Sequence, residues 1–462
     1  MPTRVLIVGA GGREHAIAWK LASEPGINAV YVAPGSAAME AEARVTALPG
    51  VDPLDAESVT AAARKVAAEL VVIGPEAPLA AGVADALRLA GFAVFGPGRG
   101  AARIESSKAF CHDVARAAGI RMPRFGSFAD PAAAAAFART LAADGHGVVV
   151  KADGLAAGKG VTVADDVEAA LAAIDLLALD ASGAEPFVVI EERLRGPEAS
   201  LIAIADGRDV LAMPLARDHK RLLDGDAGPN TGGMGAFSPL PDLDDGAVEG
   251  LLDAFHRPLL AELARRGSPF IGALYAGLML TDDGPVLLEC NARFGDPETQ
   301  AIMPRLAGPI GPLLLAAAGR GLRAAATAAG IRGSVLPTLP GSAVAIVLAS
   351  AGYPDAVRRG EPISGLDAVI AGGDLVFHAG TRRDDAGRYL TNGGRVVAVV
   401  GRGDDLAAAA HRADAAAALV SFRGAQRRTD IARASIAPPE IVPPGIAAPA
   451  SAGAAGVAGG AR

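Results

Sequence analysis

The sequence has few cysteines and no long apolar run, and each scarcity excludes a class of protein. Only Cys111 and Cys290 are present among 462 residues, and neither is paired with histidine at the spacing of a zinc motif, so no disulfide framework or zinc site is predicted. The longest apolar run, Phe270–Leu280, is shorter than the roughly 20 residues that cross a bilayer, so no membrane association is expected. The first residues, MPTRVLIVGAGG, lack the features of a secretory signal, and a cytoplasmic protein is expected.

Positive charge is also scarce. The chain has 43 Lys and Arg against 51 Asp and Glu, a net charge of -8, so no basic field attracts nucleic acid and no nucleic-acid partner is expected. Only six of the cations are lysines. Because lysine is a compact charge that fits narrow phosphate pockets, a lysine kept in an arginine-rich chain is a candidate for a specific task. Four of them, Lys108, Lys151, Lys159 and Lys220, lie in the motifs described below.

The chain length predicts two to four domains. Residues 4–100 alternate short apolar runs with Ala-rich stretches predicted to be helical, such as Glu57–Glu69. This pattern is typical of parallel α/β structure, and we predict an N-terminal α/β domain at 1–105. Its apolar runs end in the turns GAGG, APGS, GPEAP and FGPG. Because ligands bind outside the carboxyl ends of parallel strands, these turns are expected to share one ligand-binding edge.

Residues 106–330 have longer elements and mixed strands, which predicts a larger α+β domain. Within it, a small lobe at about 125–193 is expected, with two strands around a glycine-rich loop, a helix at Asp166–Leu179 and the strand PFVVIEE. Residues 331–436 return to β-type runs with a helix at Asp404–Val420, which predicts a β-rich C-terminal domain. The tail, 437–462, is rich in Ala, Pro and Gly and is expected to be disordered.

Two glycine-rich turns are candidates for phosphate binding. GAGGREH, Gly9–His15, follows a strand and opens a helix, so its N–H groups could hold an anion. Glu14 stands where the dinucleotide fingerprint requires a third small residue, and an ordinary βα turn stays open as the alternative. KADGLAAGKG, Lys151–Gly160, has cations at both ends of a flexible loop that could fold over a triphosphate. It does not match the P-loop pattern, and an ordinary hairpin is the alternative.

The stretch LLECNARFGDPETQ places Glu289, Asn291 and Arg293 at alternate positions, so on a strand they share one face. Two oxygen ligands beside a guanidinium suit Mg²⁺ with a bound phosphoryl group, and a solvated strand face is the alternative. The long polar segment Arg217–Pro239 is expected to be functional or disordered. The sequence contains no Ser/His/Asp or Cys/His constellation that indicates an enzyme nucleophile.

Taken in order, a series of motifs resembles the phosphoribosylamine–glycine ligases, a family of ATP-grasp enzymes, over residues 4–435: GGREHAIAWK, GPEAPL, KADGLAAGKGV, DHKR, GPNTGGMGA, LYAGLM, RFGDPETQ, FHAGT and TNGGRV. The resemblance implies an N-terminal α/β domain, an ATP-grasp domain with a lid lobe, and a C-terminal domain. It also implies that ATP activates glycine as glycyl phosphate, which then joins 5-phospho-β-D-ribosylamine in the second step of de novo purine synthesis.

The same resemblance implies roles for individual residues. Glu289 and Asn291 would hold Mg²⁺ or Mn²⁺, and Arg293, Lys220 and Asp218 would be catalytic. The residues implied to bind ATP are Lys108, Lys151, Gly158, Lys159, Gly160, Glu191, Glu192, Leu194 and Glu198. The residues implied to bind glycine and phosphoribosylamine are Gly11, Gly12, Arg13, Glu76, Thr231, Gly232, Gly233, Met234 and Asp296.

Several points stay open at the level of sequence. The strand at Phe270–Leu280 carries no acid that could serve as a second metal ligand, so the number of metal ions is undecided. Ala10 and Ser36 depart from the asparagines expected in the family's turns, which leaves the phosphoribosylamine pocket undefined. A monomer or weak dimer is expected. The alternatives are another ATP-grasp ligase or carboxylase of purine metabolism, a nicotinamide-dependent oxidoreductase, and a nucleotide-binding protein without activity.

Overall fold

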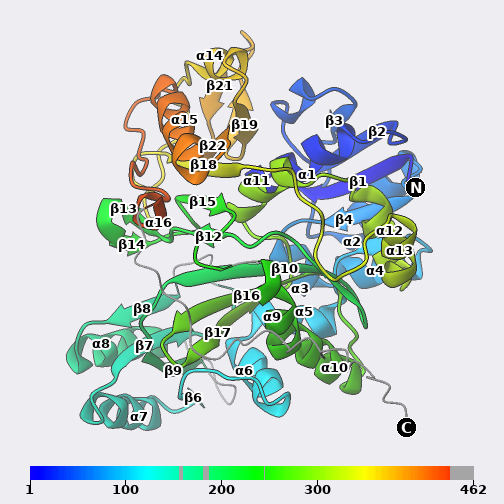
Figure 1. The fold of residues 1–462 in the computed structure, drawn as a ribbon. Helices are drawn as coiled ribbons and strands as arrows, with labels where there is room; N and C mark the ends of the chain where they lie inside the picture. Colours follow the sequence, from blue (N-terminus) through cyan, green and yellow to red (C-terminus); the bar gives the residue numbers. More distant parts are fainter. Residues whose placement is uncertain (156–159, 180–186, 244, 437–462) are drawn as a thin grey trace, which may run out of the picture.

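The computed structural model describes residues 1–155, 160–179, 187–243 and 245–436 (Figure 1). Its N-terminal part contains one parallel sheet in the order β3-β2-β1-β4-β5. The strands are β1 (Arg4–Gly9), β2 (Ala29–Pro34), β3 (Val45–Ala47), β4 (Leu70–Ile73) and β5 (Val94–Phe95). The predicted parallel α/β architecture is therefore confirmed, and the carboxyl ends of these strands share one edge of the sheet.

The helices of this part are α1 (Gly12–Ala22), α2 (Ala56–Lys65), α3 (Glu76–Ala81) and α4 (Val83–Leu89). The helix predicted to run to residue 69 ends at Lys65 instead. Ala67 has a positive φ of 48°, a left-handed conformation that cannot continue a right-handed helix. This end of the predicted helix was therefore wrong.

The central sheet is antiparallel and has the order β11-β10-β16-β17. Its strands are β10 (Glu198–Asp206), β11 (Val210–Ala212), β16 (Ile271–Thr281) and β17 (Gly284–Asn291). Alternate residues of β10 enter different hydrophobic clusters, with Leu201 in one and Ile202 in the other, so this strand separates two cores. The surrounding helices are α5 (Arg99–Ser106), α6 (Lys108–Ala117), α9 (Asp245–Leu251), α10 (Arg257–Arg265), α11 (Glu298–Ile302), α12 (Gly311–Ala318) and α13 (Leu322–Ala328).

A small lobe lies below the central sheet in Figure 1 and has its own hydrophobic core. Its antiparallel sheet has the order β6-β9-β7-β8, with β6 (Phe125–Phe128), β7 (Gly147–Ala152), β8 (Val161–Ala164) and β9 (Val188–Arg193). Its helices are α7 (Pro131–Ala143) and α8 (Val167–Ala178). The side chain of Asp166 accepts a hydrogen bond from the Ala169 N–H and so caps the start of α8, close to where a helix was predicted.

The C-terminal part is built on a sheet of order β12-β15-β18-β22-β19. Its strands are β12 (Arg217–Asp218), β15 (Gly235–Ser238), β18 (Ser342–Ala349), β19 (Leu375–His378) and β22 (Arg395–Gly403). Its helices are α14 (Leu366–Ala371), α15 (Leu406–Leu419) and α16 (Arg433–Ile436). Strands β20 (Thr381–Arg383) and β21 (Tyr389–Thr391) form a separate hairpin. Strands β12 and β15 come from the polar segment 217–239, which therefore extends the C-terminal sheet; β13 (Arg221–Leu223) and β14 (Ala227–Asn230) form a hairpin within it. The domain limits near residues 105 and 330 stay predictions.

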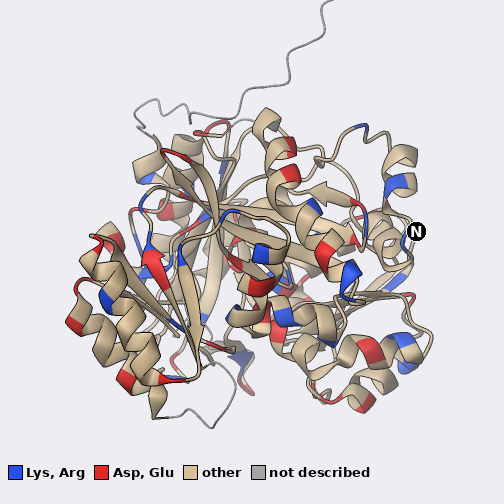
Figure 2. Cartoon of the chain, turned by 90° about the horizontal axis from the view of Figure 1, so that it is seen from below, with Lys and Arg blue, Asp and Glu red and all other residues tan. Residues whose placement is uncertain are grey.

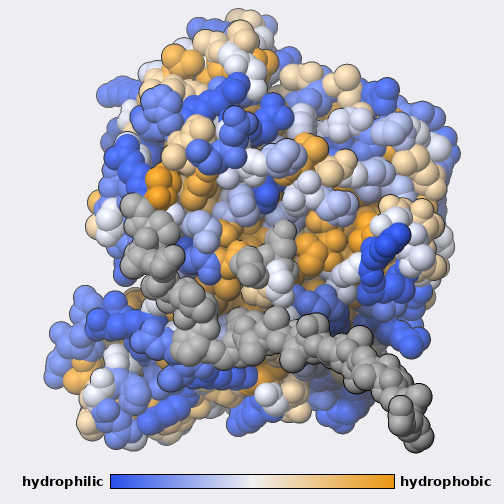
Figure 3. Space-filling view, in the orientation of Figure 1, coloured by the Kyte–Doolittle hydropathy of each residue, from blue (hydrophilic) through white to orange (hydrophobic). Residues whose placement is uncertain are grey.

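Charged residues of both signs are spread along the described parts of the chain. Figure 2 shows Lys and Arg intermixed with Asp and Glu in all parts of the chain that the structure describes. On the face drawn in Figure 3, hydrophobic residues gather in the middle of the main body, whereas the small lobe is mostly hydrophilic. Among the described residues, no helix combines the length and hydropathy that a membrane-spanning segment needs.

Candidate active site

A cavity of about 1080 Å³ is lined by residues of the N-terminal part, the central sheet, the small lobe and the C-terminal sheet, and it exceeds the roughly 300–1,000 Å³ of most small-molecule pockets. Its lining includes these predicted site residues: Arg13, Glu76, Lys108, Lys151, Gly160, Glu191, Glu192, Leu194, Glu198, Asp218, Lys220, Thr231, Gly232, Glu289, Asn291, Arg293 and Asp296. Residues far apart in sequence thus meet at one place with room for more than one ligand.

Four predicted site residues that the structure describes, Gly11, Gly12, Gly233 and Met234, are not among those that line the cavity. Gly158 and Lys159 lie outside the residues that the structure describes. Gly11 is the N-cap of α1, Gly12 is the first residue of that helix, and Gly233 lies in the loop between β14 and β15. Met234 is fully buried in a small apolar cluster with Leu222 and Ala349, so its side chain contributes packing rather than substrate contact.

Two lysines enter the cavity from different elements. The Lys151 Nζ, on β7, lies 2.8 Å from Glu191 Oε1 and donates to the Leu288 carbonyl at 3.0 Å. Lys108, the first residue of α6, donates to the Gly154 carbonyl at 3.0 Å. Burial lowers the pKa of Lys108, although the charge of Glu289 opposes this shift. Two ammonium groups in one polar cavity form a natural receptor for phosphate oxygens.

The start of the glycine-rich segment is fastened to α6. The Asp153 carboxylate accepts hydrogen bonds from the Ser107 Oγ at 3.0 Å and the Ala109 N–H at 3.1 Å. This carboxylate therefore occupies the N-terminus of α6 and holds the segment close to Lys108.

Strand β9 and the residue after it carry Glu191, Glu192 and Leu194, which the resemblance implies to bind ATP. Glu191 is buried and its carboxylate faces Lys151 and the Nε2 of His112, which is 2.8 Å away. Burial raises the pKa of Glu191, but the nearby Lys151 charge and the His112 hydrogen bond outweigh it, so the pKa lies below its ordinary value. The Glu191 side chain is thus held by cations, while Glu192 and Leu194 follow it along the cavity wall.

Strand β17 presents two oxygen donors to the cavity. Glu289 and Asn291 are half-buried and flank the buried Cys290, which confirms the alternation expected of a strand. Arg293 follows the end of β17 and lines the same cavity. Opposite Glu289, a Cβ on Gly277 would lie 2.9 Å from the Glu289 Cγ, so a glycine on β16 gives this carboxylate its space.

Lys220 joins the two carboxylates nearest to it. Its Nζ lies 2.9 Å from Glu198 Oε2 and 3.3 Å from Glu289 Oε1. The positive charge of Lys220 lowers the pKa of Glu289 to about 2. Lys151 and Arg293 act in the same direction, and these charges together outweigh burial, which alone would raise the pKa of Glu289. Nearby Asp218 is half-buried, and the loss of solvation together with the charge of Glu298 raises its pKa well above the ordinary value for an aspartate.

Arg293 is held by carboxylates of the N-terminal part. Its Nη2 lies 3.0 Å from Glu105 Oε1 and its Nε lies 3.5 Å from Glu76 Oε2. Arg13 approaches Glu76 at 3.9 Å and donates to the Phe294 carbonyl at 3.1 Å. Two arginines thus converge on one wall of the cavity, already oriented by protein acceptors.

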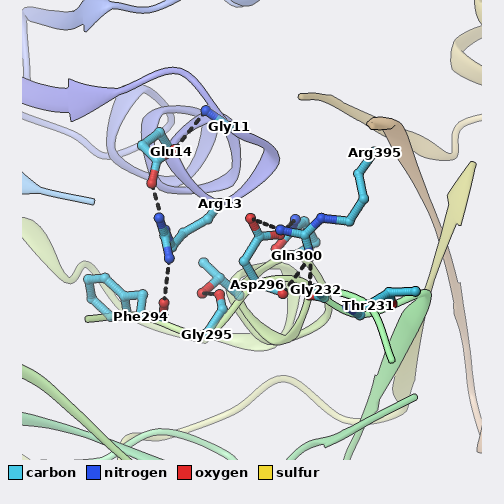
Figure 4. A network of polar contacts seen from close by, with 12 residues as sticks. Gly11, Arg13, Glu14, Thr231, Gly232, Phe294, Gly295, Asp296, Gln300 and Arg395 are labelled. Atoms are coloured by element: carbon cyan, nitrogen blue, oxygen red, sulfur yellow. Dashed lines mark hydrogen bonds and ion pairs between the residues drawn. The ribbon is translucent and has the colours of Figure 1, made fainter. Parts of the chain in front are cut away.

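A separate network of hydrogen bonds joins the C-terminal sheet to the loops that contain Gly232 and Asp296 (Figure 4). Arg395 on β22 donates to the Asp296 carbonyl at 2.7 Å and to the Asp296 Oδ2 at 2.9 Å, and it also donates to the Gly232 carbonyl. The Gln300 Nε2 donates to the Asp296 Oδ1 at 2.7 Å. Each oxygen of the Asp296 carboxylate therefore has a donor from the protein.

Comparison with known proteins decides the family. The chain matches the N domain of phosphoribosylglycinamide synthetase at residues 3–105, its ATP-grasp (A) domain at 106–299 and its C domain at 343–434. It is 48% identical over 433 residues to the phosphoribosylamine–glycine ligase of Streptomyces coelicolor, covering 93% of this chain and 98% of that protein. The corresponding enzyme of Caulobacter vibrioides is 45% identical over 428 residues, covering 92% and 97%. The chain belongs to the phosphoribosylglycinamide synthetase family.

Solved structures agree with this assignment. The crystal structure of phosphoribosylamine–glycine ligase from Thermotoga maritima superposes with a TM-score of 0.75 at 33% identity, covering 93% of this chain and all of that one. A biotin carboxylase domain from Hydrogenobacter thermophilus gives a TM-score of 0.64 at 16% identity, which shows a shared fold only. The predicted fold class, with N-terminal α/β, ATP-grasp and C-terminal parts, is confirmed.

The ATP-grasp fold of the family implies the use of ATP and a divalent metal ion. Within the described residues, three or more His, Cys, Asp or Glu side chains nowhere gather as a metal site. The pair Glu289 and Asn291 nevertheless fits a metal ion that arrives with ATP. Mg²⁺ is commonly held by one or two protein oxygens, with phosphate oxygens and water completing its shell.

The turn at Gly9–His15 differs from the phosphate site suggested by its sequence. The Gly11 N–H donates to the Glu14 Oε2 at 2.7 Å, and the Arg13 Nε donates to the Glu14 Oε1 at 2.6 Å. A Cβ on Gly74 would lie 2.1 Å from the same carboxylate. The anion at this helix N-terminus is therefore the protein's own Glu14, and this leaves no place there for a dinucleotide pyrophosphate.

Sequence reasoning missed several residues of the cavity. Glu298 accepts from the Ser200 Oγ at 3.1 Å, and the Ser200 Oγ lies 3.0 Å from the Tyr275 hydroxyl. Glu298 and Tyr275 lie inside the motifs RFGDPETQ and LYAGLM, which could have indicated them, as TNGGRV could have indicated Arg395. Glu105, Ser200 and His112 lie outside every motif that was singled out.

Proposed function

We propose that this chain ligates glycine to 5-phospho-β-D-ribosylamine, consuming ATP and releasing glycinamide ribonucleotide, ADP and phosphate, in the second step of de novo purine synthesis. The observation that carries this proposal is a single cavity lined by Lys108, Lys151, Glu289, Asn291 and Arg293. The chain that forms this cavity is 48% identical to the phosphoribosylamine–glycine ligase of Streptomyces coelicolor. The chemistry has two stages and requires no covalent enzyme intermediate.

In the first stage, a carboxylate oxygen of glycine attacks the γ-phosphorus of ATP, and ADP leaves. Lys108 and Lys151 bind phosphate oxygens, and the guanidinium of Arg293 offsets the negative charge on the transferred group. Glu289 and Asn291 would hold Mg²⁺ or Mn²⁺, and the bound ion would supply positive charge to the phosphate oxygens. The product of this stage is glycyl phosphate.

In the second stage, the amine of phosphoribosylamine attacks the carbonyl carbon of glycyl phosphate, and phosphate leaves. Asp218 lines the cavity close to Lys220, and we assign to its carboxylate the acceptance of the proton lost by the amine. Lys220 bridges Glu198 and Glu289 and so holds two carboxylates of the ATP side of the cavity in place.

The acceptor side of the cavity comprises Arg13, Glu76, Thr231, Gly232 and Asp296. Thr231 is buried, and its Oγ1 donates to the Lys220 carbonyl at 2.8 Å, so this loop is joined to the catalytic segment. Because an acyl phosphate hydrolyses in water, a cavity enclosed by the small lobe and the larger body protects the intermediate.

The proposal is tested by ADP release with ATP, Mg²⁺, glycine and phosphoribosylamine, the last formed in situ from phosphoribosyl pyrophosphate and ammonia. Each component is omitted in turn. The expected result is release that requires both glycine and phosphoribosylamine. Release that needs neither substrate, or none under any combination, overturns the proposed substrates.

A further inference from the structure

His112 is a buried histidine beside the ATP lysines, and no step of the chemistry above uses it. It lies on α6, and only 4% of the residue is exposed. Its Nδ1 is 2.7 Å from the carbonyl oxygen of Lys108, and its Nε2 is 2.8 Å from Glu191 Oε1. The ring therefore lies between the backbone of Lys108 and the carboxylate of Glu191, which in turn pairs with Lys151.

Both neighbours of the ring are hydrogen-bond acceptors. A backbone carbonyl has no proton to give, and the Glu191 carboxyl, with its lowered pKa, is ionised. A neutral imidazole has one N–H and one lone pair, so in either tautomer it would direct a lone pair at an oxygen. Two short contacts to two acceptors favour a doubly protonated, cationic ring, in which Nδ1–H donates to the Lys108 carbonyl and Nε2 forms an ion pair with Glu191.

The charge of this ring changes what Lys151 offers to a ligand. Glu191 lies between Lys151 and His112, with 2.8 Å to each, and all three groups are nearly buried. If His112 were neutral, Glu191 would cancel the charge of Lys151. With a cationic ring the three groups carry one net positive charge, and it faces the cavity.

We propose that His112 is a positioning residue for ATP: its imidazolium holds Glu191 and leaves the charge of Lys151 available to a phosphate oxygen. This inference rests on the proposed function, because it assumes that ATP occupies the cavity. His112 itself makes no contact with substrate and acts through Glu191 and Lys151.

The charged state gives ATP binding a pH dependence. The titratable groups that face the ring are Glu191 on β9, Lys151 on β7 and Cys111 on its own helix. The ring of Phe125 on β6 also packs against the imidazole, with 4.4 Å between the two ring centroids. Burial lowers the pKa of His112, but the hydrogen bond and charge of Glu191 outweigh it, so the pKa lies above its ordinary value of about 6.5. ATP affinity is therefore full below this pKa and falls as pH rises through it.

The test is calorimetric titration of the full chain with ATP and Mg²⁺ between pH 6 and 9.5, without glycine or phosphoribosylamine. His112→Gln is expected to weaken ATP binding about tenfold at pH 6 and to flatten the pH dependence. His112→Lys, which restores a cation, is expected to bind within about threefold of the wild type. His411→Gln, at an exposed histidine of α15, serves as the matched control and is expected to change nothing.

The outcomes separate this inference from the proposed function. Wild-type affinity and pH dependence in His112→Gln overturn the role of His112. ATP binding without glycine-dependent turnover overturns only the proposed function, and absence of ATP binding by the wild type overturns both.

A second test uses only the wild-type chain, so it holds even if His112→Gln fails to fold. The chain is labelled with ¹⁵N-histidine, and NMR reports whether each imidazole nitrogen carries a proton. The His112 signals are expected to show protons on both ring nitrogens at pH 6. One unprotonated ring nitrogen at this pH overturns the inference.

Discussion

Arg395 binds Asp296 twice, through its carbonyl oxygen at 2.7 Å and its carboxylate at 2.9 Å, although the two residues are 99 positions apart in the chain. The same guanidinium donates to the Gly232 carbonyl. One side chain of the C-terminal sheet thus fixes two loops on the acceptor side of the cavity. The C-terminal part therefore shapes the site directly.

Replacement of Arg395 is expected to impair use of the acceptor substrates. Hydrogen bonds to charged groups contribute about 1.5–3 kcal/mol, so Arg395→Ala is expected to lower kcat/KM for phosphoribosylamine about 10- to 100-fold, with ATP affinity within about twofold of the wild type. Steady-state kinetics with each substrate varied give these values. Arg402→Ala, at an exposed residue of the same strand, is the control, and an equal loss of ATP affinity in Arg395→Ala would contradict the assignment.

Glu289 is expected to be essential for metal-dependent turnover. Its low pKa keeps it ionised throughout the physiological range, and Glu289→Gln removes that charge while keeping the shape. We expect kcat to fall at least about 100-fold and the Mg²⁺ concentration for half-maximal rate to rise. Titration of activity with Mg²⁺ is the measurement, and Asp283→Asn at the exposed turn of the same hairpin is the control. Full activity of Glu289→Gln at saturating Mg²⁺ would show that the metal lies elsewhere.

Gly277 tests the same carboxylate from the opposite strand. An alanine Cβ there would lie 2.9 Å from the Glu289 Cγ and force this side chain to move. Overpacking costs about 1–3 kcal/mol, and we expect Gly277→Ala to lower kcat about tenfold or more through the displaced ligand. Gly308→Ala has open space at its Cβ and should behave as the wild type in thermal unfolding and kinetics. Unchanged kinetics in Gly277→Ala would refute the close approach.

Glu14 is expected to matter for stability. It is buried and accepts from Gly11 and Arg13, so Glu14→Ala leaves the buried Arg13 guanidinium without its nearest partner. Breaking a buried ion pair costs roughly 3–5 kcal/mol, and urea unfolding should show a loss of about 3 kcal/mol. Glu57→Ala, at an exposed acid in the first turn of α2, should stay within about 0.5 kcal/mol. A similar small loss for Glu14→Ala would mean that Arg13 finds another acceptor.

The parts of the site that depend on local periodicity could be predicted from the sequence. Strand alternation placed Glu289 and Asn291 on one face of a strand. The apolar runs that end in glycine-containing turns predicted which edge of the N-terminal sheet carries those turns. The scarcity of lysine made Lys108, Lys151 and Lys220 candidates for a specific task, and all three line the cavity. Each of these inferences needs only the composition or the neighbours along the chain.

The parts that depend on distant contacts could not be predicted in this way. The partners of Arg395 lie on other loops, and the charge on His112 follows only from the two oxygens around its ring. The role of Glu14 was missed because a carboxylate at a helix N-terminus replaces the external anion that the glycine turn suggested. Tertiary contacts decided these cases, and spacing along the sequence does not reveal them.

The central claim is that glycine is activated at its carboxylate by ATP. Glycine labelled with ¹⁸O in both carboxylate oxygens tests it most directly, with released phosphate analysed by mass spectrometry. Because the attacking oxygen stays with phosphorus when the amine displaces phosphate, the account predicts one ¹⁸O atom in each phosphate and one in the amide product. Unlabelled phosphate formed together with glycinamide ribonucleotide would contradict the account.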